Sequence, residues 1–95
     1  MSSRNDYVRK MHAKLDVWNA EIDALAAKAD QAAAETRAEY HKRIEALRAQ
    51  RDDARKKMEH LQSAGESAWQ DMKAGVEMAW GALGEAIDSA KSRFK

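Results

Sequence analysis

The chain has 95 residues, of which 44% are hydrophobic, 35% are charged and 6% are aromatic. Its 17 basic and 16 acidic residues leave a net charge of +1, so it lacks the basic excess that is typical of nucleic-acid-binding domains. Proline and cysteine are both absent, which excludes disulfides and thiolate metal sites and removes the strongest helix breaker. A composition rich in Ala, Glu, Lys, Arg and Leu is typical of long helices and coiled coils.

The first six residues, Met1 to Asp6, contain no apolar segment of the kind that forms a secretory signal. No run of the sequence approaches the roughly 18 apolar residues of a membrane span. We therefore expect a cytoplasmic, all-α protein that forms one coiled-coil domain over residues 1–95.

Apolar side chains follow one helical stripe from residue 8 to residue 94. They fall on one face when each residue is placed at about 100° per step around a helix axis. Packing of such a face usually supplies most of the stability of a helix. The stripe residues that we predict to form an oligomer interface are Met11, Leu15, Trp18, Ile22, Leu25, Tyr40, Ile44, Leu47, Met58, Leu61, Trp69, Met72, Val76, Trp80, Leu83, Ile87 and Phe94.

The first predicted element is a long amphipathic helix over about residues 4–62. Thr36-Arg37-Ala38-Glu39 has the form of a capping box, which would mark a helix start. It follows a run of alanines that strongly favours helix, and the stripe keeps its phase throughout, so we expect the helix to continue through it. Such a helix would be roughly 90 Å long.

The second predicted element is a helix over about residues 66–93, after a hinge or turn at 63–67. Ser63-Ala64-Gly65-Glu66 has the form of a capping box, and Gly65 is a poor residue for a helix interior. The sequence is equally compatible with an antiparallel hairpin at this hinge and with a nearly continuous rod. Three helices of about thirty residues each are a third alternative.

The second helix has a wider apolar surface than the first. The small residues that we predict for close helix packing there are Gly75, Ala79, Ala82 and Ala86. Each of Gly75, Gly81 and Gly84 costs about 1 kcal/mol in a helix interior relative to alanine, which argues for a packing or bending role. This part of the chain could be the buried core of an oligomer, a helix on a membrane or lipid granule, or a helix in the groove of a partner protein.

No pattern of catalytic or metal-ligating residues is present. His12, His41 and His60 have no histidine or cysteine at i+3 or i+4, and the Glu-x-x-His spacing of carboxylate metal sites does not occur. Glycine-rich phosphate loops and nucleophile elbows are also missing. We therefore expect no enzyme activity, no metal and no cofactor. The basic stretch 48–57 is interrupted by two aspartates, so nucleic-acid binding is not expected.

Arg51 is unusual because it points into the apolar stripe. A charged residue in a helical seam can select the register of the helices at some cost in stability. Alternatively, its stem lies along the stripe while its guanidinium reaches Glu or Asp on a neighbouring helix. We favour the second interpretation, with register selection as a by-product.

Two segments that contain tryptophan resemble a group of small bacterial coiled-coil proteins that are sometimes labelled stress-response proteins. They are Tyr7-Val8-Arg9-Lys10-Met11-His12-Ala13-Lys14-Leu15-Asp16-Val17-Trp18-Asn19-Ala20-Glu21-Ile22 and Ala68-Trp69-Gln70-Asp71-Met72-Lys73-Ala74-Gly75-Val76-Glu77-Met78-Ala79-Trp80. The resemblance implies a bacterial origin, a helical fold and stress-linked expression. It brings no established activity and no catalytic residues.

A helix over 4–62 cannot cover its own stripe, so another copy, another protein or a membrane must cover it. Small symmetric oligomers are the commonest solution. We therefore expect a structural or scaffolding homo-oligomer. The alternatives are an amphipathic protein that coats membranes or storage granules, peripheral to the membrane, and a helical adaptor for a partner protein.

Overall fold

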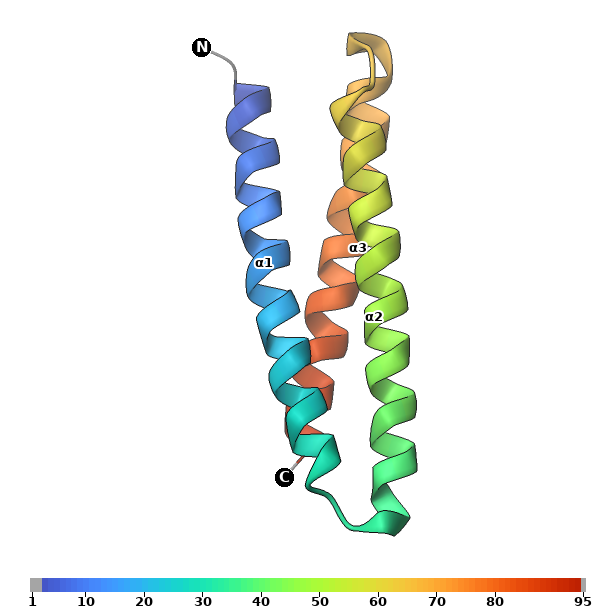
Figure 1. Ribbon diagram of the computed structural model, residues 1–95. Coiled ribbons are helices and arrows are strands. Elements are labelled where there is room, and N and C mark those ends of the chain that lie inside the picture. Colours follow the sequence, from blue (N-terminus) through green and yellow to red (C-terminus); the bar gives the residue numbers. More distant parts are fainter. Residues whose placement is uncertain (1–2, 95) are drawn as a thin grey trace.

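The computed structural model describes residues 3–94, which form three helices joined by two short turns (Figure 1). Helix α1 spans Ser3–Asp30, α2 spans Ala34–Gln62 and α3 spans Glu66–Arg93. Consecutive helices are antiparallel, so that α1 and α3 run downward and α2 runs upward in Figure 1, and the bundle measures 51 × 20 × 17 Å. The prediction of an all-helical fold is confirmed. The prediction of one helix over 4–62 is wrong, and the third alternative, three helices of similar length, describes the chain.

The first turn covers residues 31–33, within the run of alanines. The N–H groups of Gln31 and Ala32 each donate to the carbonyl three residues earlier, at 3.1 Å, which tightens the end of α1. Ala33 then takes an extended ψ of 150° as the N-cap of α2, and the Arg37 guanidinium donates to the Ala32 carbonyl. Alanine favours helix in isolation, but burial of the α1 stripe against α2 overrides that local preference.

The second turn lies at residues 63–65, inside the predicted hinge, and it does not form the predicted capping box. Gly65 is the N-cap of α3, and no side chain caps it. The Ser63 hydroxyl instead donates backwards, to the carbonyls of Glu59 and His60 at 3.3 and 3.2 Å. Ser63 therefore closes the end of α2 and leaves the start of α3 without a side-chain cap.

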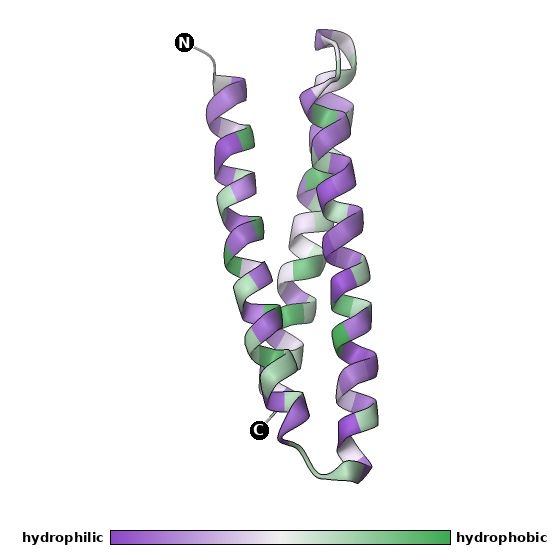
Figure 2. Ribbon diagram, viewed as in Figure 1, coloured by the Kyte–Doolittle hydropathy of each residue, from purple (hydrophilic) through white to green (hydrophobic). Residues whose placement is uncertain are grey.

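The core runs along the axis of the bundle, where the three apolar faces meet (Figure 2). Its buried residues are Ala29, Ala54 and Ala90 together with twelve residues of the predicted interface, which are Leu15, Ile22, Leu25, Ile44, Leu47, Met58, Leu61, Val76, Trp80, Leu83, Ile87 and Phe94. The chain therefore covers its own stripe, which removes the argument that a second molecule must do so. None of the helices described here is long and apolar enough to cross a membrane.

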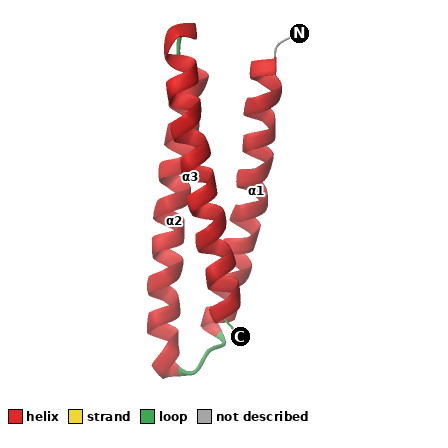
Figure 3. Ribbon diagram, turned by 180° about the vertical axis from the view of Figure 1, so that it is seen from behind, coloured by secondary structure: helices red, strands yellow, loops and turns green. Residues whose placement is uncertain are grey.

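The two ends of the bundle differ. In Figures 1 and 3 the N-terminal half of α1 stands apart from α2 and α3, while its second half lies against them. Buried side chains on α1 begin only at Leu15, and Tyr7, Val8 and Met11 are partly buried. We call this the open end.

The opposite end is closed by aromatic packing. The Phe94 ring is 1% exposed and stacks on Tyr40, with ring centroids 4.1 Å apart. The Tyr40 hydroxyl donates to the Arg93 carbonyl at 3.1 Å, and Lys28 Nζ donates to the Phe94 carbonyl at 3.3 Å. All three helices are thus tied together where α3 ends.

Candidate functional site

The residues predicted to form an oligomer interface lie in the core of a single chain. Those that are buried are Leu15, Ile22, Leu25, Ile44, Leu47, Met58, Leu61, Val76, Trp80, Leu83, Ile87 and Phe94. Those that are partly buried and pack against the core are Met11, Trp18, Tyr40, Trp69 and Met72. Their role between copies stays a prediction, and it would require the bundle to open.

Arg51 lies at the edge of the core, with 22% of its side chain exposed. Its Nη1 donates to Asn19 Oδ1 on α1 at 3.1 Å, and its Nε and Nη2 donate to Asp52 Oδ1 at 3.2 and 3.0 Å. The guanidinium therefore reaches a carboxylate of its own helix and an amide of a neighbouring helix. Both partners belong to the same chain, so Arg51 fixes α2 against α1.

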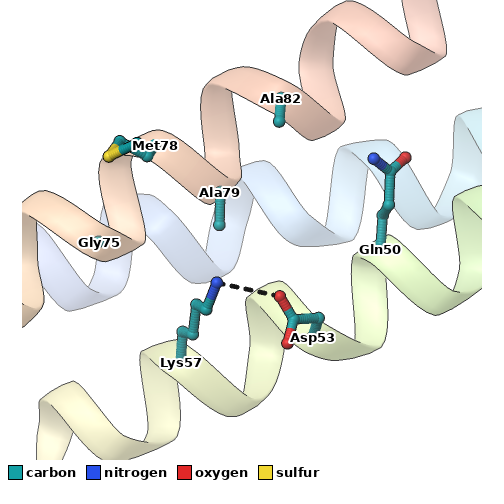
Figure 4. Close-up of a pocket in the computed structure, with 7 residues that line it drawn as sticks. All are labelled: Gln50, Asp53, Lys57, Gly75, Met78, Ala79 and Ala82. Carbon is teal, nitrogen blue, oxygen red and sulfur yellow. Dashed lines mark ion pairs between the residues drawn. The ribbon is translucent and has the colours of Figure 1, made fainter.

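The small residues predicted for close packing line a groove between α2 and α3 (Figure 4). One hollow of about 300 Å³ is lined by Gln50, Asp53, Lys57, Gly75, Met78, Ala79 and Ala82. A second hollow of about 180 Å³ is lined by Arg43, Ala46, Leu47, Gln50, Ala86, Ser89 and Ala90. Gln50 borders both, so the two hollows form one groove along the bundle.

Small residues form the floor of this groove, and its two sides differ: the α2 side carries charged residues, and the α3 side carries an exposed methionine. On the α2 rim, Lys57 Nζ lies 3.1 Å from Asp53 Oδ2, so these two charges neutralise each other, and Lys57 points toward Ala79 (Figure 4). On the α3 rim, Met78 is 77% exposed. The other large apolar residue that is exposed in the described part of the chain, Val17, is 57% exposed. No atom lies within 4 Å of a Cβ built on Gly75, so no contact within the chain requires glycine there.

A second stripe on α3 follows this groove, beside the core stripe. Its residues are Asp71, Gly75, Met78, Ala82, Ala86, Ser89 and Arg93. Steps of three and four residues place them on one helical face. We call this the groove stripe. Its order is symmetric: each residue before Ala82 has a counterpart at the same distance after it, and Asp71 and Arg93 stand eleven residues away on either side.

The charged ends of the groove stripe are free. Both Asp71 and Arg93 are exposed, and neither forms an ion pair with another residue in 3–94. Sequence reasoning missed Asp71, Met78, Ser89 and Arg93, because the stronger core stripe was followed alone. The signal that could have found them is the symmetric spacing about Ala82.

Within the described part of the chain, no group of three or more His, Cys, Asp or Glu side chains is placed to hold a metal ion. His41 Nε2 lies 2.9 Å from Asp30 Oδ1, across the first turn, where it joins the end of α1 to α2.

Comparison with known proteins gives no match: no family model, no curated protein and no solved structure matches this chain.

Proposed function

We propose that this chain is a self-associating structural protein in which two copies pair through their groove stripes. The helices α3 run antiparallel about a two-fold axis at Ala82. The observation that carries the proposal is the symmetric order of the groove stripe. A two-fold interface uses the same patch on both subunits, so it needs a patch that is complementary to its own rotated copy.

Side-chain sizes fit this arrangement. About the axis at Ala82, Met78 faces the partner subunit's Ala86, and Gly75 faces the partner subunit's Ser89. Each larger side chain meets a smaller one, which lets two helices approach with few voids. The pairing also covers the exposed Met78 and the open space above Gly75.

Charge specifies the direction. In the antiparallel pair, Asp71 lies opposite the partner subunit's Arg93 at both ends of a stripe that is roughly 33 Å long. A parallel pair would place like charges against each other, which is unfavourable. Because Asp71 and Arg93 have no ion-pair partner among residues 3–94, a second copy supplies each with its counter-charge.

The first test places a like-charge pair on the proposed axis. Ala82 is exposed, so Ala82→Glu should leave the bundle folded while it brings two carboxylates together in the dimer. Ala13→Glu, on the exposed face of α1, is the matched control. We expect analytical ultracentrifugation to give a dimer for the wild type and for Ala13→Glu, and a helical monomer for Ala82→Glu. A wild type that stays monomeric at roughly 1 mM would refute the proposal.

The second test exchanges the terminal charges. Asp71→Arg should weaken the dimer, and Asp71→Arg with Arg93→Asp should restore it. An exposed ion pair contributes roughly 0.2–1 kcal/mol, and the dimer contains two of them. The dimer dissociation constants of the wild type, Asp71→Arg, Arg93→Asp and the double variant give the coupling between the two sites directly. If the loss of dimerisation free energy in the double variant equals the sum of the losses in the two single variants, the antiparallel order is incorrect.

A further inference from the structure

A hollow at the open end is lined by cations and aromatic rings. Its volume is about 440 Å³, and its lining residues are Arg4, Asp6, Tyr7, Lys10, Trp69, Gln70 and Lys73. It lies between the first turns of α1 and the first turns of α3, because α1 and α3 run in the same direction and their N-termini lie at the same end of the bundle (Figure 1). Helix N-termini carry partial positive charge, which favours anions.

Arg4 is held in place at this hollow. Its guanidinium carbon lies 4.2 Å from the centroid of the Trp69 ring, in a cation–π contact. Its Nη2 donates to the carbonyls of Ala64 and Leu61 at the end of α2. Both bonds come from Nη2, so Nε and Nη1 keep donors for another acceptor. A guanidinium fixed in this way loses little further freedom when it binds an anion.

Lys73 is placed in a similar way. Its Nζ lies 4.8 Å from the centroid of the Tyr7 ring, and that ring meets Trp69 edge to face with centroids 5.9 Å apart. The order across the hollow is therefore cation, ring, ring, cation. Lys10 adds a third positive charge to the lining.

None of Arg4, Lys10 and Lys73 forms an ion pair with a carboxylate among residues 3–94. The lining holds three basic side chains and one acidic side chain, Asp6. In a chain whose net charge is only +1, this is a local excess of positive charge.

We infer that the hollow at the open end binds a phosphate-bearing anion. A phosphate group accepts several charge-assisted hydrogen bonds at once, which suits a hollow whose lining includes a guanidinium and two ammonium groups. The same chemistry is offered by free phosphate, by a phosphorylated small molecule and by the headgroup of an anionic lipid. The hollow lies on the side of α3 that faces α1, whereas the groove lies on the side that faces α2, so the inference does not rest on the proposed dimer.

The test follows backbone amide shifts by NMR during a titration with inorganic phosphate at low ionic strength. Saturable shifts should gather at residues 4–10 and 66–73. Lys10→Gln with Lys73→Gln should weaken binding roughly tenfold, because two charge-assisted contacts are lost. Lys42→Gln with Lys56→Gln removes the same charge from exposed positions on α2, and it should change the affinity by less than about twofold. Arg4 is left in place because it also closes the end of α2.

Two results would overturn the inference: no saturable shift up to roughly 10 mM phosphate, or an equal loss of affinity in both double variants. Equal shifts with sodium acetate at matched ionic strength would also overturn it. Flotation with phosphatidylcholine vesicles, with and without phosphatidic acid, separates the sources. Binding to phosphatidic acid that is lost only in Lys10→Gln with Lys73→Gln identifies the lipid headgroup. Phosphate binding without vesicle binding identifies a soluble ligand.

Discussion

At the scale of single residues, two glycines one turn apart on α3 have different surroundings. A Cβ built on Gly84 would lie 3.2 Å from Cζ2 of Trp18, whereas nothing lies within 4 Å of a Cβ on Gly81. The Trp18 ring is tilted against Trp80, with ring centroids 6.2 Å apart, and both rings border a hollow of about 480 Å³ between α1 and α3. The close approach of α1 to α3 therefore depends on Gly84 and not on Gly81.

The two glycines should respond differently to substitution by alanine. Gly81→Ala should stabilise the bundle by about 1 kcal/mol through helix propensity. Gly84→Ala gains the same propensity but displaces Trp18, at a cost of about 1–3 kcal/mol for overpacking. We expect urea titrations to give a free energy of unfolding that is lower for Gly84→Ala than for Gly81→Ala by about 1 kcal/mol or more. Equal gains would show that Trp18 moves freely.

Tyr7 makes stability depend on pH in the alkaline range. Burial raises the pKa of Tyr7 from 10.0 to about 12, and the neighbouring Glu77 carboxylate contributes. The hydroxyl oxygen is buried near the Glu77 carboxylate, but the two groups do not have the geometry of a regular hydrogen bond. Between pH 10 and about 12 the unfolded chain loses this proton before the folded one does, so unfolding becomes easier as the pH rises. Below pH 10 both states are protonated, and the contribution is fully present.

Tyr7→Phe should therefore flatten the alkaline decline in the free energy of unfolding. At neutral pH it should be neutral or stabilising, because a buried hydroxyl without a regular hydrogen bond is removed. Urea midpoints measured across the alkaline range in both proteins provide the comparison. The hydrogen bond from Lys91 to Glu21 also raises the pKa of Lys91, but it is present in both proteins and cancels. Identical slopes for the two proteins would exclude Tyr7 as the titrating group.

At the scale of helices, the two halves of α1 are held unequally. From Leu15 onward, α1 contributes Leu15, Ile22, Leu25 and Ala29 to the core, while the residues before Leu15 contribute only partly buried side chains. Local opening costs little free energy where few apolar contacts are lost. The first half of α1 should therefore open without the rest of the bundle.

Amide hydrogen exchange should reveal this difference. We expect residues 7–14 to exchange at least about tenfold faster than residues 76–90, because sub-global opening of α1 exposes them first. The second half of α1 should resemble α2 and α3. Uniform protection along α1 would show that its N-terminal half is packed as firmly as the remainder. Addition of inorganic phosphate should slow the exchange of the first half if the hollow at the open end is filled.

The periodicity of the sequence predicts which residues lie in the core, but it does not predict where the first turn lies. A helix in an up-down bundle needs only to direct its own stripe toward the axis, so an unbroken phase is compatible with a turn. Alanine at Ala32 and Ala33 carries no turn signal, and the contacts that favour the turn join residues far apart in the chain. The groove stripe was hidden for another reason: its small side chains give little hydrophobic contrast beside the core stripe.

At the scale of the whole molecule, compactness separates the bundle from a rod. The Cα radius of gyration of the bundle is 15.4 Å. A single helix over 4–62 would alone be roughly 90 Å long. Small-angle scattering of the Ala82→Glu monomer should therefore give a radius close to that of the bundle, after allowance for hydration. A radius typical of an extended rod would contradict the turn at 31–33.

The difference between the two ends of the bundle determines where the open ends lie in the proposed antiparallel pair. A two-fold axis at Ala82 sends the open end of one copy toward one pole of the assembly and the open end of its partner toward the other. If two copies pair in this way, the two proposed anion-binding hollows lie on opposite sides of the axis, roughly 33 Å apart along the helices, because the α3 residues of each hollow lie about eleven residues from Ala82. Such a pair would be divalent, and it would crosslink two phosphate-bearing objects with an avidity that neither hollow provides alone.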